Sequence, residues 1–298
     1  MGERLDVWPK MRKLVITFLA LLSALETQSG RIVVLAPLSS QSHRNVMSGF
    51  YAGLAERGHE VIVVASGKPS KPQKNVKEII VVENPNWFGN FSSMEMRSGG
   101  PLLFLKIDFS NMLTYCRQFY ENPQVQELLS TEIDLIMNDA IGGYCAHGFI
   151  HKTGAPLVTV LTSVAYNSLI RHTGNHLPPS FVPDVFSPYF GEMNFWQRTM
   201  NLLYGILSVM FFGLNKSQME GIYREYVGPV TPSVDEIEAN ASLVLVNGHL
   251  SFDVPKPVLP DVIHAGGAHC VPGKPLPKVS LSILRYKPWL SHCFCVST

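Results

Sequence analysis

The chain carries little charge and almost no excess of either sign. Of its 298 residues, 16% are Asp, Glu, Lys or Arg, and the formal net charge at pH 7 is +1. Proteins that bind nucleic acid usually show a basic excess, often interleaved with aromatic side chains, and no such stretch occurs here. The composition therefore argues against a nucleic-acid partner, whereas the hydrophobic share of 46% allows a large core.

Cysteine is also scarce. The five cysteines are unevenly spread and odd in number, which argues against a disulfide framework. Cys116 and Cys145 lie in apolar stretches that predict helices, and we interpret them as core residues.

Motifs for nucleotide binding and nucleophilic catalysis are missing. The sequence has no G-x-G-x-x-G dinucleotide fingerprint and no G-x-S-x-G nucleophile elbow. The stretch from Gly267 to Lys274 resembles a phosphate-binding loop, but it has five residues between its glycines. Pro275 also stands where that loop needs Ser or Thr, so we reject it as a phosphate site.

Two histidine pairs have the four-residue spacing that metal ligands show on a helix. They are His147 with His151 and His172 with His176. No third ligand is apparent for either pair, and no glutamate placed as a general base lies between the first two. We predict structural roles for these histidines and no metal site.

The first 29 residues have the pattern of a secretory signal peptide. Positive charges up to Lys13 precede Leu14–Leu25, an uncharged apolar run that is too short to span a bilayer comfortably. Cleavage is expected near residues 24–30, and an uncleaved buried helix is the alternative. Three glycosylation sequons agree with delivery to the secretory lumen; they begin at Asn90, Asn215 and Asn240.

Residues 31–66 predict a strand, a helix and a second strand, the order of a right-handed βαβ unit in a parallel sheet. Arg31–Ala36 and Val61–Ala65 are apolar, β-branched runs, as strands buried on both faces should be. Ser42 is expected to cap the helix between them.

The spacing of residues on this helix predicts how it packs. Apolar Val46, Phe50 and Leu54 recur every four residues and predict its buried face. Gly49 and Gly53 predict a close approach to the sheet. The helix is therefore expected to lie directly on the strands that flank it.

The rest of the chain continues the alternation of strands and helices. Strands are predicted at Glu78–Val82, Ile133–Asn138, Leu157–Leu161, Leu243–Asn247 and Val262–Ala265. Helices are predicted at Leu102–Tyr120, Gln124–Leu129, Tyr144–Lys152 and Ser233–Ala239. This order predicts an α/β fold with a Rossmann-like, doubly wound parallel sheet.

Between residues 177 and 226 the sequence changes in character. The segment Leu177–Tyr189 contains four prolines and must be irregular. Phe195–Gly213 is strongly apolar and aromatic, but it is short for a membrane span and contains Asn201. We predict a buried or membrane-surface helix there, with a helical pattern resuming at Tyr223–Tyr226.

Two residues at predicted strand ends are candidates for chemistry. His43 lies near the first turn of its helix, where the helix dipole disfavours imidazolium and predicts a neutral, proton-accepting ring. Asp139 follows the strand Ile133–Asn138, at the same edge of the sheet, where a carboxylate can orient a histidine. The alternatives are a local hydrogen bond for His43 and a turn or capping role for Asp139. Spacing alone does not separate these readings.

Four blocks of sequence resemble the UDP-glycosyltransferases, in particular the animal UDP-glucuronosyltransferases. They are SHRNVMSGFYAGLAERGHEVIVV, IDLIMNDA, FVPDVFSPYFGEMNFWQRTMNLLYG and LVLVNGHLSFDVPKPVLPDVIHAGGAHCVPGKPLPK. Their order and spacing are similar to the acceptor-binding half of the family from Arg31 to Lys278. The resemblance implies the N-terminal domain of a GT-B glycosyltransferase at 30–278, which follows the predicted signal peptide at 1–29 and precedes a divergent tail at 279–298.

The resemblance also implies a reaction. The residue at the position of His43 would be the general base that takes a proton from the hydroxyl of a small lipophilic acceptor, and Asp139 would orient it. The acceptor oxygen would then attack the anomeric carbon of a UDP-sugar, a glucuronosyl or glucosyl donor, with inversion. Neither a metal nor a cofactor besides the UDP-sugar co-substrate is implied. Apolar loops and Phe195–Gly213 would form the acceptor pocket, in a glycoprotein of the endoplasmic reticulum lumen that serves detoxification.

The chain departs from the family after Lys278. The family continues with a UDP-sugar domain, a membrane helix and a basic tail, and residues 279–298 match none of them. We therefore expect no donor-binding residues here, and no sugar transfer by the chain alone. The alternative is an inactive isoform that binds acceptors or pairs with full-length family members as a homo- or hetero-oligomer. An unrelated α/β binding protein would need four blocks to coincide by chance.

Overall fold

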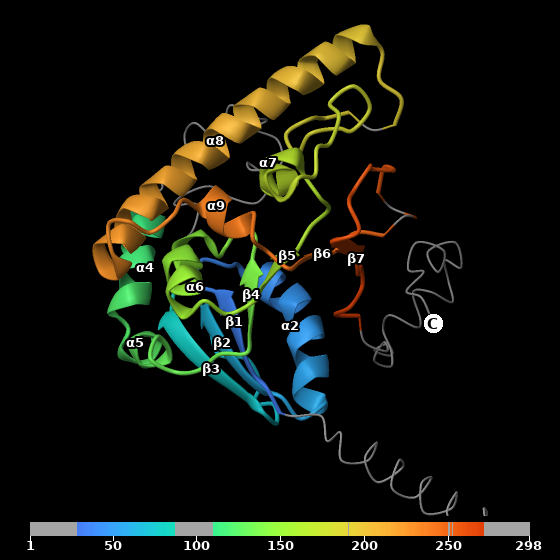
Figure 1. Cartoon of the computed structure of the whole chain (residues 1–298). Coiled ribbons are helices and arrows are strands. Elements are labelled where there is room, and N and C mark those ends of the chain that lie inside the picture. The colour runs from blue at the N-terminus through green and yellow to red at the C-terminus, as the bar shows by residue number, and fades with distance from the viewer. Residues whose placement is uncertain (1–28, 87–109, 190, 250, 252, 271–298) are drawn as a thin grey trace, which may run out of the picture.

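A computed structural model describes residues 29–86, 110–189, 191–249, 251 and 253–270. Within them, seven parallel strands form one sheet in the order β3-β2-β1-β4-β5-β6-β7 (Figure 1). The strands are β1 (Arg31–Ala36), β2 (Glu60–Ser66), β3 (Val76–Val82), β4 (Leu135–Asp139), β5 (Leu157–Leu161), β6 (Leu243–Val246) and β7 (Val262–His264). The predicted doubly wound parallel sheet is confirmed.

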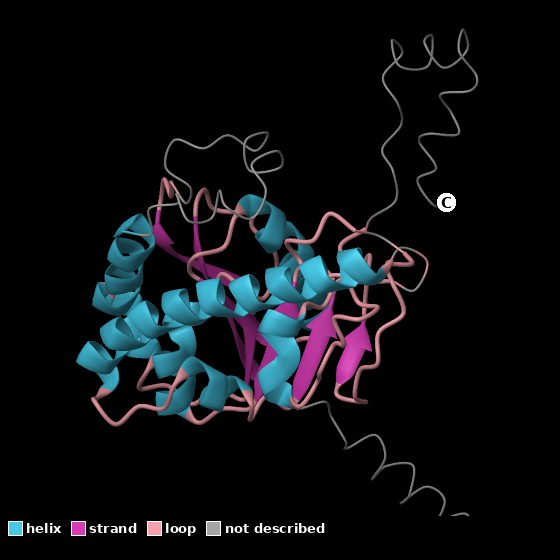
Figure 2. Ribbon diagram, turned by 90° about the horizontal axis from the view of Figure 1, so that it is seen from above, coloured by secondary structure: helices cyan, strands magenta, loops and turns pink. Residues whose placement is uncertain are grey.

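Helices cover both faces of the sheet (Figure 2). They are α2 (Gln41–Glu56), α4 (Ser110–Glu121), α5 (Pro123–Leu128), α6 (His147–Thr153), α7 (Asn167–Ile170), α8 (Phe195–Val227) and α9 (Val234–Glu238). Short 3₁₀ turns, η2 (Tyr144–Ala146) and η3 (Arg171–Thr173), precede α6 and follow α7. One core cluster joins α2 to its face of the sheet, and the larger cluster joins α4, α5, α6 and α8 to the other.

The central strands are buried on both faces because helices lie above and below them. Every residue of β5 is buried, as are all but the first of β1, which is why their apolar runs predicted the bounds of both strands correctly. The other predicted strands agree to within two residues. Because β4 extends one residue further than predicted, Asp139 is the last residue of the strand itself.

The predicted cap of helix α2 is wrong, whereas its predicted apolar face is extended. Ser40, not Ser42, is the N-cap residue, and its side chain makes no capping hydrogen bond. The buried apolar residues are Val46, Met47, Tyr51 and Ala55. The predicted Phe50 and Leu54 are half-buried and pack against the same core cluster.

The segment after β7 explains one of the two glycines of α2. A Cβ atom at Gly49 would lie 2.5 Å from the backbone of Ala268, so the close approach is to the chain after β7, not to the sheet. At Gly53 the nearest neighbour of such an atom is the Arg57 side chain, 3.4 Å away. The predicted contact of these glycines with the sheet is therefore wrong.

Helix α8 is continuous over 33 residues, so the predicted resumption at residue 223 is a single uninterrupted helix. A capping box fixes its start, because the Asn194 and Gln197 side chains each accept from the other's backbone N–H. Its C-terminal half packs in the core, whereas its N-terminal half projects beyond the sheet (Figure 1). Among the described residues, no helix is long and apolar enough to cross a membrane.

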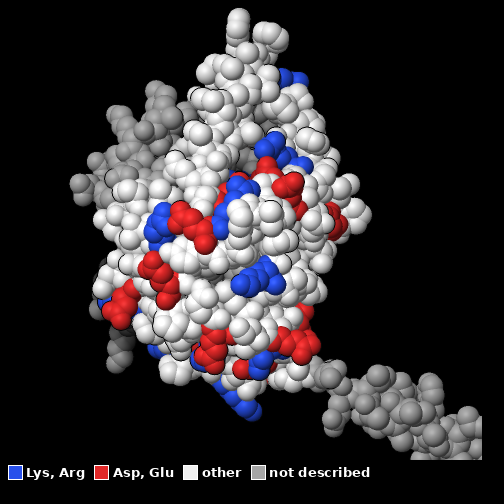
Figure 3. All heavy atoms as spheres, turned by 60° about the vertical axis from the view of Figure 1, so that its left-hand side comes forward, with Lys and Arg blue, Asp and Glu red and all other residues white. Residues whose placement is uncertain are grey.

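The projecting half of α8 is apolar and exposed. Phe195 and Trp196 are each 73% exposed, and between residues 195 and 215 the only charged residue is Arg198. The other large exposed apolar residues on it are Met200, Leu202, Leu203, Ile206, Leu207, Met210 and Leu214. Figure 3 shows the same asymmetry, since charged side chains gather low on the face drawn and few reach its upper end.

The cysteines and sequons need two further corrections. Cys116 on α4 and Cys145 in η2 are fully buried, as predicted, but they form a disulfide rather than two free core thiols. Asn215 lies inside α8 with its amide donating to the Phe211 carbonyl, so this sequon is inaccessible in the folded chain. Asn240 is exposed in the turn after α9.

Several predictions fall outside the described residues. These are the signal peptide at 1–29 apart from its last residue, the sequon at Asn90, the start of the Leu102–Tyr120 helix, and the tail at 279–298. The described part of that helix is α4, which ends one residue later than predicted.

Candidate active site

The direction in which the strand order runs changes between β1 and β4. The chain moves from β1 to β2 and β3 on one side, then returns to place β4 on the other side of β1. In open parallel sheets, ligands bind beyond the carboxyl ends of the strands at such a switch point. His43, in the first turn of α2, and Asp139, at the end of β4, meet at this point.

The two predicted residues are in direct contact. His43 Nδ1 lies 2.7 Å from Asp139 Oδ2, although the residues are 96 positions apart in the chain. The Asp139 side chain is completely buried, whereas that of His43 remains 25% exposed. Because an ionised carboxylate only accepts hydrogen bonds, His43 Nδ1 carries the proton of this bond. In the neutral ring, Nε2 is then the unprotonated nitrogen.

Asp139 is held by two further donors that the sequence did not reveal. The buried Ser39 hydroxyl donates to the same oxygen, Oδ2, and the Ile141 N–H donates to Oδ1 over 3.2 Å. Three donors around one buried carboxylate fix its orientation toward His43. The predicted alternative of a turn role for Asp139 is thus compatible with the pairing, as the Ile141 contact shows.

Two glycines let the loop after β4 close over this carboxylate. A Cβ atom at Gly142 would lie 2.1 Å from the Ser39 hydroxyl and 2.7 Å from Asp139 Oδ2. One at Gly143 would lie 2.0 Å from the Asn138 side chain. The Gly142 carbonyl also accepts from the Leu38 N–H over 2.8 Å, which ties this loop to the one after β1. A side chain at Gly142 would push the two loops apart, and one at Gly143 would displace the Asn138 side chain.

Burial and the carboxylate act on the pKa of His43 in opposite directions. Burial lowers this pKa, but the hydrogen bond from His43 to Asp139 and the negative charge of Asp139 raise it by more. The pKa therefore lies above its ordinary value of 6.5. This direction is opposite to the one that the helix dipole alone predicted, because a carboxylate at 2.7 Å outweighs a partial charge at the helix end.

The arrangement can accept a proton at one defined atom. Among the described residues, no hydrogen-bond partner is found for His43 Nε2. A histidine whose other nitrogen is held by a buried carboxylate has the geometry of a general base, with the carboxylate stabilising the imidazolium that forms. The pair can therefore deprotonate a hydroxyl group brought to Nε2.

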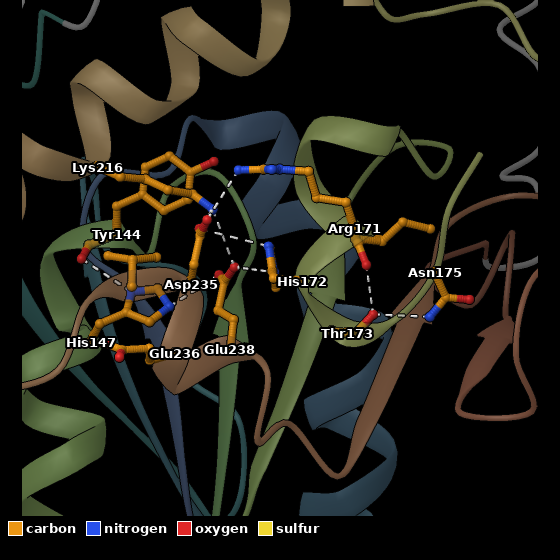
Figure 4. Close-up of polar contacts among 12 residues, drawn as sticks. Tyr144, His147, Arg171, His172, Thr173, Asn175, Lys216, Asp235, Glu236 and Glu238 are labelled. Carbon is orange, nitrogen blue, oxygen red and sulfur yellow. Dashed lines mark hydrogen bonds and ion pairs between the residues drawn. The ribbon is translucent and has the colours of Figure 1, made fainter. Parts of the chain in front are cut away.

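A second polar cluster joins α6, η3, α8 and α9 (Figure 4). Buried Glu238 accepts from His147 Nε2 over 3.0 Å and from His172 Nε2 over 2.6 Å. Lys216 Nζ lies 2.6 Å from Asp235 and 3.6 Å from Glu238. Burial raises the pKa of Glu238, but the Lys216 charge and the histidine hydrogen bonds outweigh burial and hold this pKa well below its ordinary value.

This cluster explains the histidine pairs of the sequence. Each pair splits, since His147 and His172 point into the cluster whereas His151 and His176 are exposed. Among the described residues, no group of three or more His, Cys, Asp or Glu side chains is placed to hold a metal ion. The structural contacts of His147 and His172 agree with the roles predicted for them.

Comparison with known proteins places these features in context. The family model "UDP-glucoronosyl and UDP-glucosyl transferase" matches residues 69–284. UDP-glucosyltransferase 2 of Dactylopius coccus is 32% identical over 286 residues, which are 93% of this chain and 55% of that protein. UDP-glucuronosyltransferase 2B14 of Oryctolagus cuniculus is 28% identical, over 76% of this chain and 46% of its own length. The chain thus spans about half the length of these relatives.

Solved structures of glycosyltransferases show a weaker likeness. The calicheamicin glycosyltransferase CalG4 is 14% identical with a TM-score of 0.42, and the match covers 80% of this chain and 53% of that one. UGT71G1 of Medicago truncatula, solved with UDP-glucose, is 14% identical with a TM-score of 0.40, over 76% and 47%.

Proposed function

The chain belongs to the UDP-glucuronosyl and UDP-glucosyl transferase family, and from that premise we propose that it supplies the acceptor-binding half of such an enzyme, with His43 as general base. The observation that carries this proposal is the hydrogen bond of 2.7 Å between His43 Nδ1 and Asp139 Oδ2 at the switch point between β1 and β4. It leaves Nε2 as the accepting nitrogen, beside the place where a ligand of this fold binds.

In the proposed reaction, neutral His43 accepts the proton of an acceptor hydroxyl at Nε2. The freed oxygen forms a bond to the anomeric carbon of a UDP-sugar as the bond from that carbon to the UDP oxygen breaks. Attack from the face opposite the leaving group inverts the configuration at that carbon. Asp139 keeps the ring in the correct tautomer and stabilises the imidazolium, as in other His–Asp pairs.

The acceptor is proposed to be a small lipophilic molecule, and the donor a glucosyl or glucuronosyl nucleotide. Large exposed apolar side chains on the projecting half of α8 support contact with such molecules or with a membrane surface. The Cys116–Cys145 disulfide supports folding in an oxidising compartment, in agreement with the proposed lumen of the endoplasmic reticulum.

Because the chain spans about half of its relatives, a non-catalytic role is the second candidate. In that role the chain binds acceptors, or pairs with a full-length family member, without transferring sugar itself. Where the chain binds acceptors, the two candidates differ in turnover alone.

Sugar transfer to 1-naphthol tests the proposed function. We expect no product from the chain alone with UDP-glucose or UDP-glucuronic acid. We expect product when residues 30–278 are fused to the remaining half of UDP-glucosyltransferase 2 of Dactylopius coccus. A folded fusion that binds UDP-sugar and 1-naphthol but forms no product would overturn the catalytic proposal and leave the binding role.

A further inference from the structure

A cavity of about 250 Å³ lies between the N-terminal half of α8 and the proline-rich segment Leu177–Tyr189. The residues that line it come from these two elements and from Asn167. None comes from α2 or β4, which carry His43 and Asp139. The cavity is therefore built from a different set of residues from the His–Asp pair.

The fully buried side-chain amide of Asn201 holds the proline-rich segment that forms one wall of the cavity. Asn201 Nδ2 donates to the carbonyl oxygens of Pro179 and Val182, each over 2.8 Å. Asn201 Oδ1 accepts from the Asp184 N–H over 2.8 Å. The irregular segment is thus held against α8 by three hydrogen bonds to one side chain. A wall that is ordered before a ligand arrives lowers the entropic cost of binding.

The cavity contains one carboxyl group and no cation. Asp184 is among the lining residues, and no described lining residue is Lys, Arg or His. Burial raises the pKa of Asp184 by more than the hydrogen bonds that it accepts lower it. Its Oδ1 accepts from the Phe186 N–H over 3.2 Å. Its Oδ2 lies 3.7 Å from the place where a Cβ atom would stand at Gly205, so the absent side chain leaves room beside the carboxylate.

Apolar side chains extend from this carboxylate along α8. Leu202, Ile206 and Met210, spaced four residues apart on one face, line the cavity and stay 48%, 49% and 59% exposed. They leave apolar surface that a ligand can cover. A cavity of about 150 Å³ holds benzene, so the present one matches about two fused rings.

We propose that this cavity binds a small lipophilic amine. The rings lie on Leu202, Ile206 and Met210, and the ammonium group pairs with the Asp184 carboxylate in the space that Gly205 leaves. Asp184 already accepts a hydrogen bond from the Phe186 N–H, but no described lining residue brings it a cation. An ammonium ion adds an opposite charge to the hydrogen bond that a neutral group of the same shape would make. This proposal rests on the proposed function in one respect, namely that the bound amine belongs to the class of small lipophilic acceptors.

Isothermal titration of the whole chain with two matched probes tests this site. Naphthalen-2-ylmethanamine carries the ammonium group, and naphthalen-2-ylmethanol is its neutral counterpart. At pH 7 we expect the amine to bind at least tenfold more tightly than the alcohol. Asp184→Asn should remove this preference and leave the affinity for the alcohol within about twofold. Equal affinity for the amine in the wild type and in Asp184→Asn would overturn the proposal.

Two substitutions at glycines of α8 control for the location. Gly205→Leu fills the space beside Asp184 and should abolish binding of both probes, whereas Gly213→Leu, with open space around it, should change neither affinity. Wild-type binding by Gly205→Leu would place the amine elsewhere and overturn the site. His43→Ala should bind the amine normally, and loss of binding there would move the site to the His–Asp pair. If the chain binds the amine normally but the fusion transfers no sugar, the proposed function is overturned and the amine site is not.

Discussion

His43 and Asp139 form a pair whose properties depend on a single hydrogen bond. The bond raises the pKa of His43 against the opposing effect of burial. It also keeps the accepting nitrogen on the side away from the carboxylate. Substitutions of the groups around Asp139 should therefore be detected most directly as changes in the pKa of His43.

Asp139→Asn should lower the pKa of His43 below its ordinary value of 6.5, because burial then acts without the opposing carboxylate. A titration of the His43 ring by NMR measures this shift. In the wild type, the raised pKa makes imidazolium stabilise the fold below the unfolded-state pKa of about 6.5. This contribution is lost as pH rises through the folded-state pKa. An unchanged His43 pKa in Asp139→Asn would show that the two side chains do not interact in solution.

Ser39→Ala should raise the pKa of His43 further. Without the Ser39 hydroxyl, Asp139 Oδ2 keeps only the hydrogen bond from His43, so its negative charge acts more strongly on the ring. The free energy of unfolding should also fall by about 1–2 kcal/mol, because the lost bond is buried. Ser39→Thr, which keeps the hydroxyl, should restore the His43 pKa. If Ser39→Thr and Ser39→Ala shift this pKa equally, Ser39 acts only through packing.

The sequence predicted His43 and Asp139 but not Ser39, and the reason is physical. Residues that leave parallel strands at their carboxyl ends meet at one edge of the sheet, so strand prediction is enough to bring the first two together. The Ser39 contact depends on how closely two loops 100 residues apart approach, which Gly142 decides. The pKa direction was also beyond the sequence, because it depends on the distance between two side chains.

At the scale of elements, the strands were the most predictable parts. Burial on both faces leaves a continuous apolar run, and Arg31–Ala36 and Leu157–Leu161 show such runs with clear ends. Helix α2 was less predictable, because the close approach at Gly49 is to the backbone of Ala268, a segment more than 200 residues away, and not to the sheet. The disulfide escaped prediction because Cys116 and Cys145 lie in apolar stretches typical of free core cysteines.

The Cys116–Cys145 bond connects α4 to η2, six residues after Asp139. A disulfide that closes a loop of about 30 residues raises the free energy of the unfolded chain by about 3–4 kcal/mol, because it reduces the number of conformations open to that chain. The double substitution of both cysteines by Ala should lower the free energy of unfolding by about this amount in denaturant titrations. Cys270→Ala, at an exposed free cysteine, is the matched control and should have little effect. Two reactive thiols at residues 116 and 145 in the unreduced, denatured chain would contradict the disulfide.

The projecting half of α8 should bind lipid surfaces. Leu203→Glu with Leu207→Glu should reduce flotation with phosphatidylcholine vesicles at least fivefold, because both side chains are 43–48% exposed on this half. Val230→Glu, at an apolar residue that is 91% exposed after α8, controls for a general effect of added charge. Because Arg198 is the only charge between residues 195 and 215, binding should persist at high salt. Equal flotation of all variants would exclude this half as the contact.

At the scale of the whole molecule, the His–Asp pair lies at the carboxyl ends of the strands, and the N-terminal half of α8 projects beyond the sheet. The chain belongs to the family and spans about half the length of its relatives. Both facts agree with the proposal that it positions an acceptor for a donor bound by another part of the enzyme. We propose that in this arrangement His43 removes the proton of the acceptor hydroxyl.

The most direct measurement compares rates of sugar transfer to 1-naphthol by the fusion described above, with and without His43→Ala. General-base catalysis contributes about 10²–10⁴-fold, so His43→Ala should lower kcat by at least 100-fold while 1-naphthol still binds. Asp139→Asn should lower kcat and move the pH profile to lower pH. A wild-type rate in His43→Ala would contradict the assignment of His43 as the base.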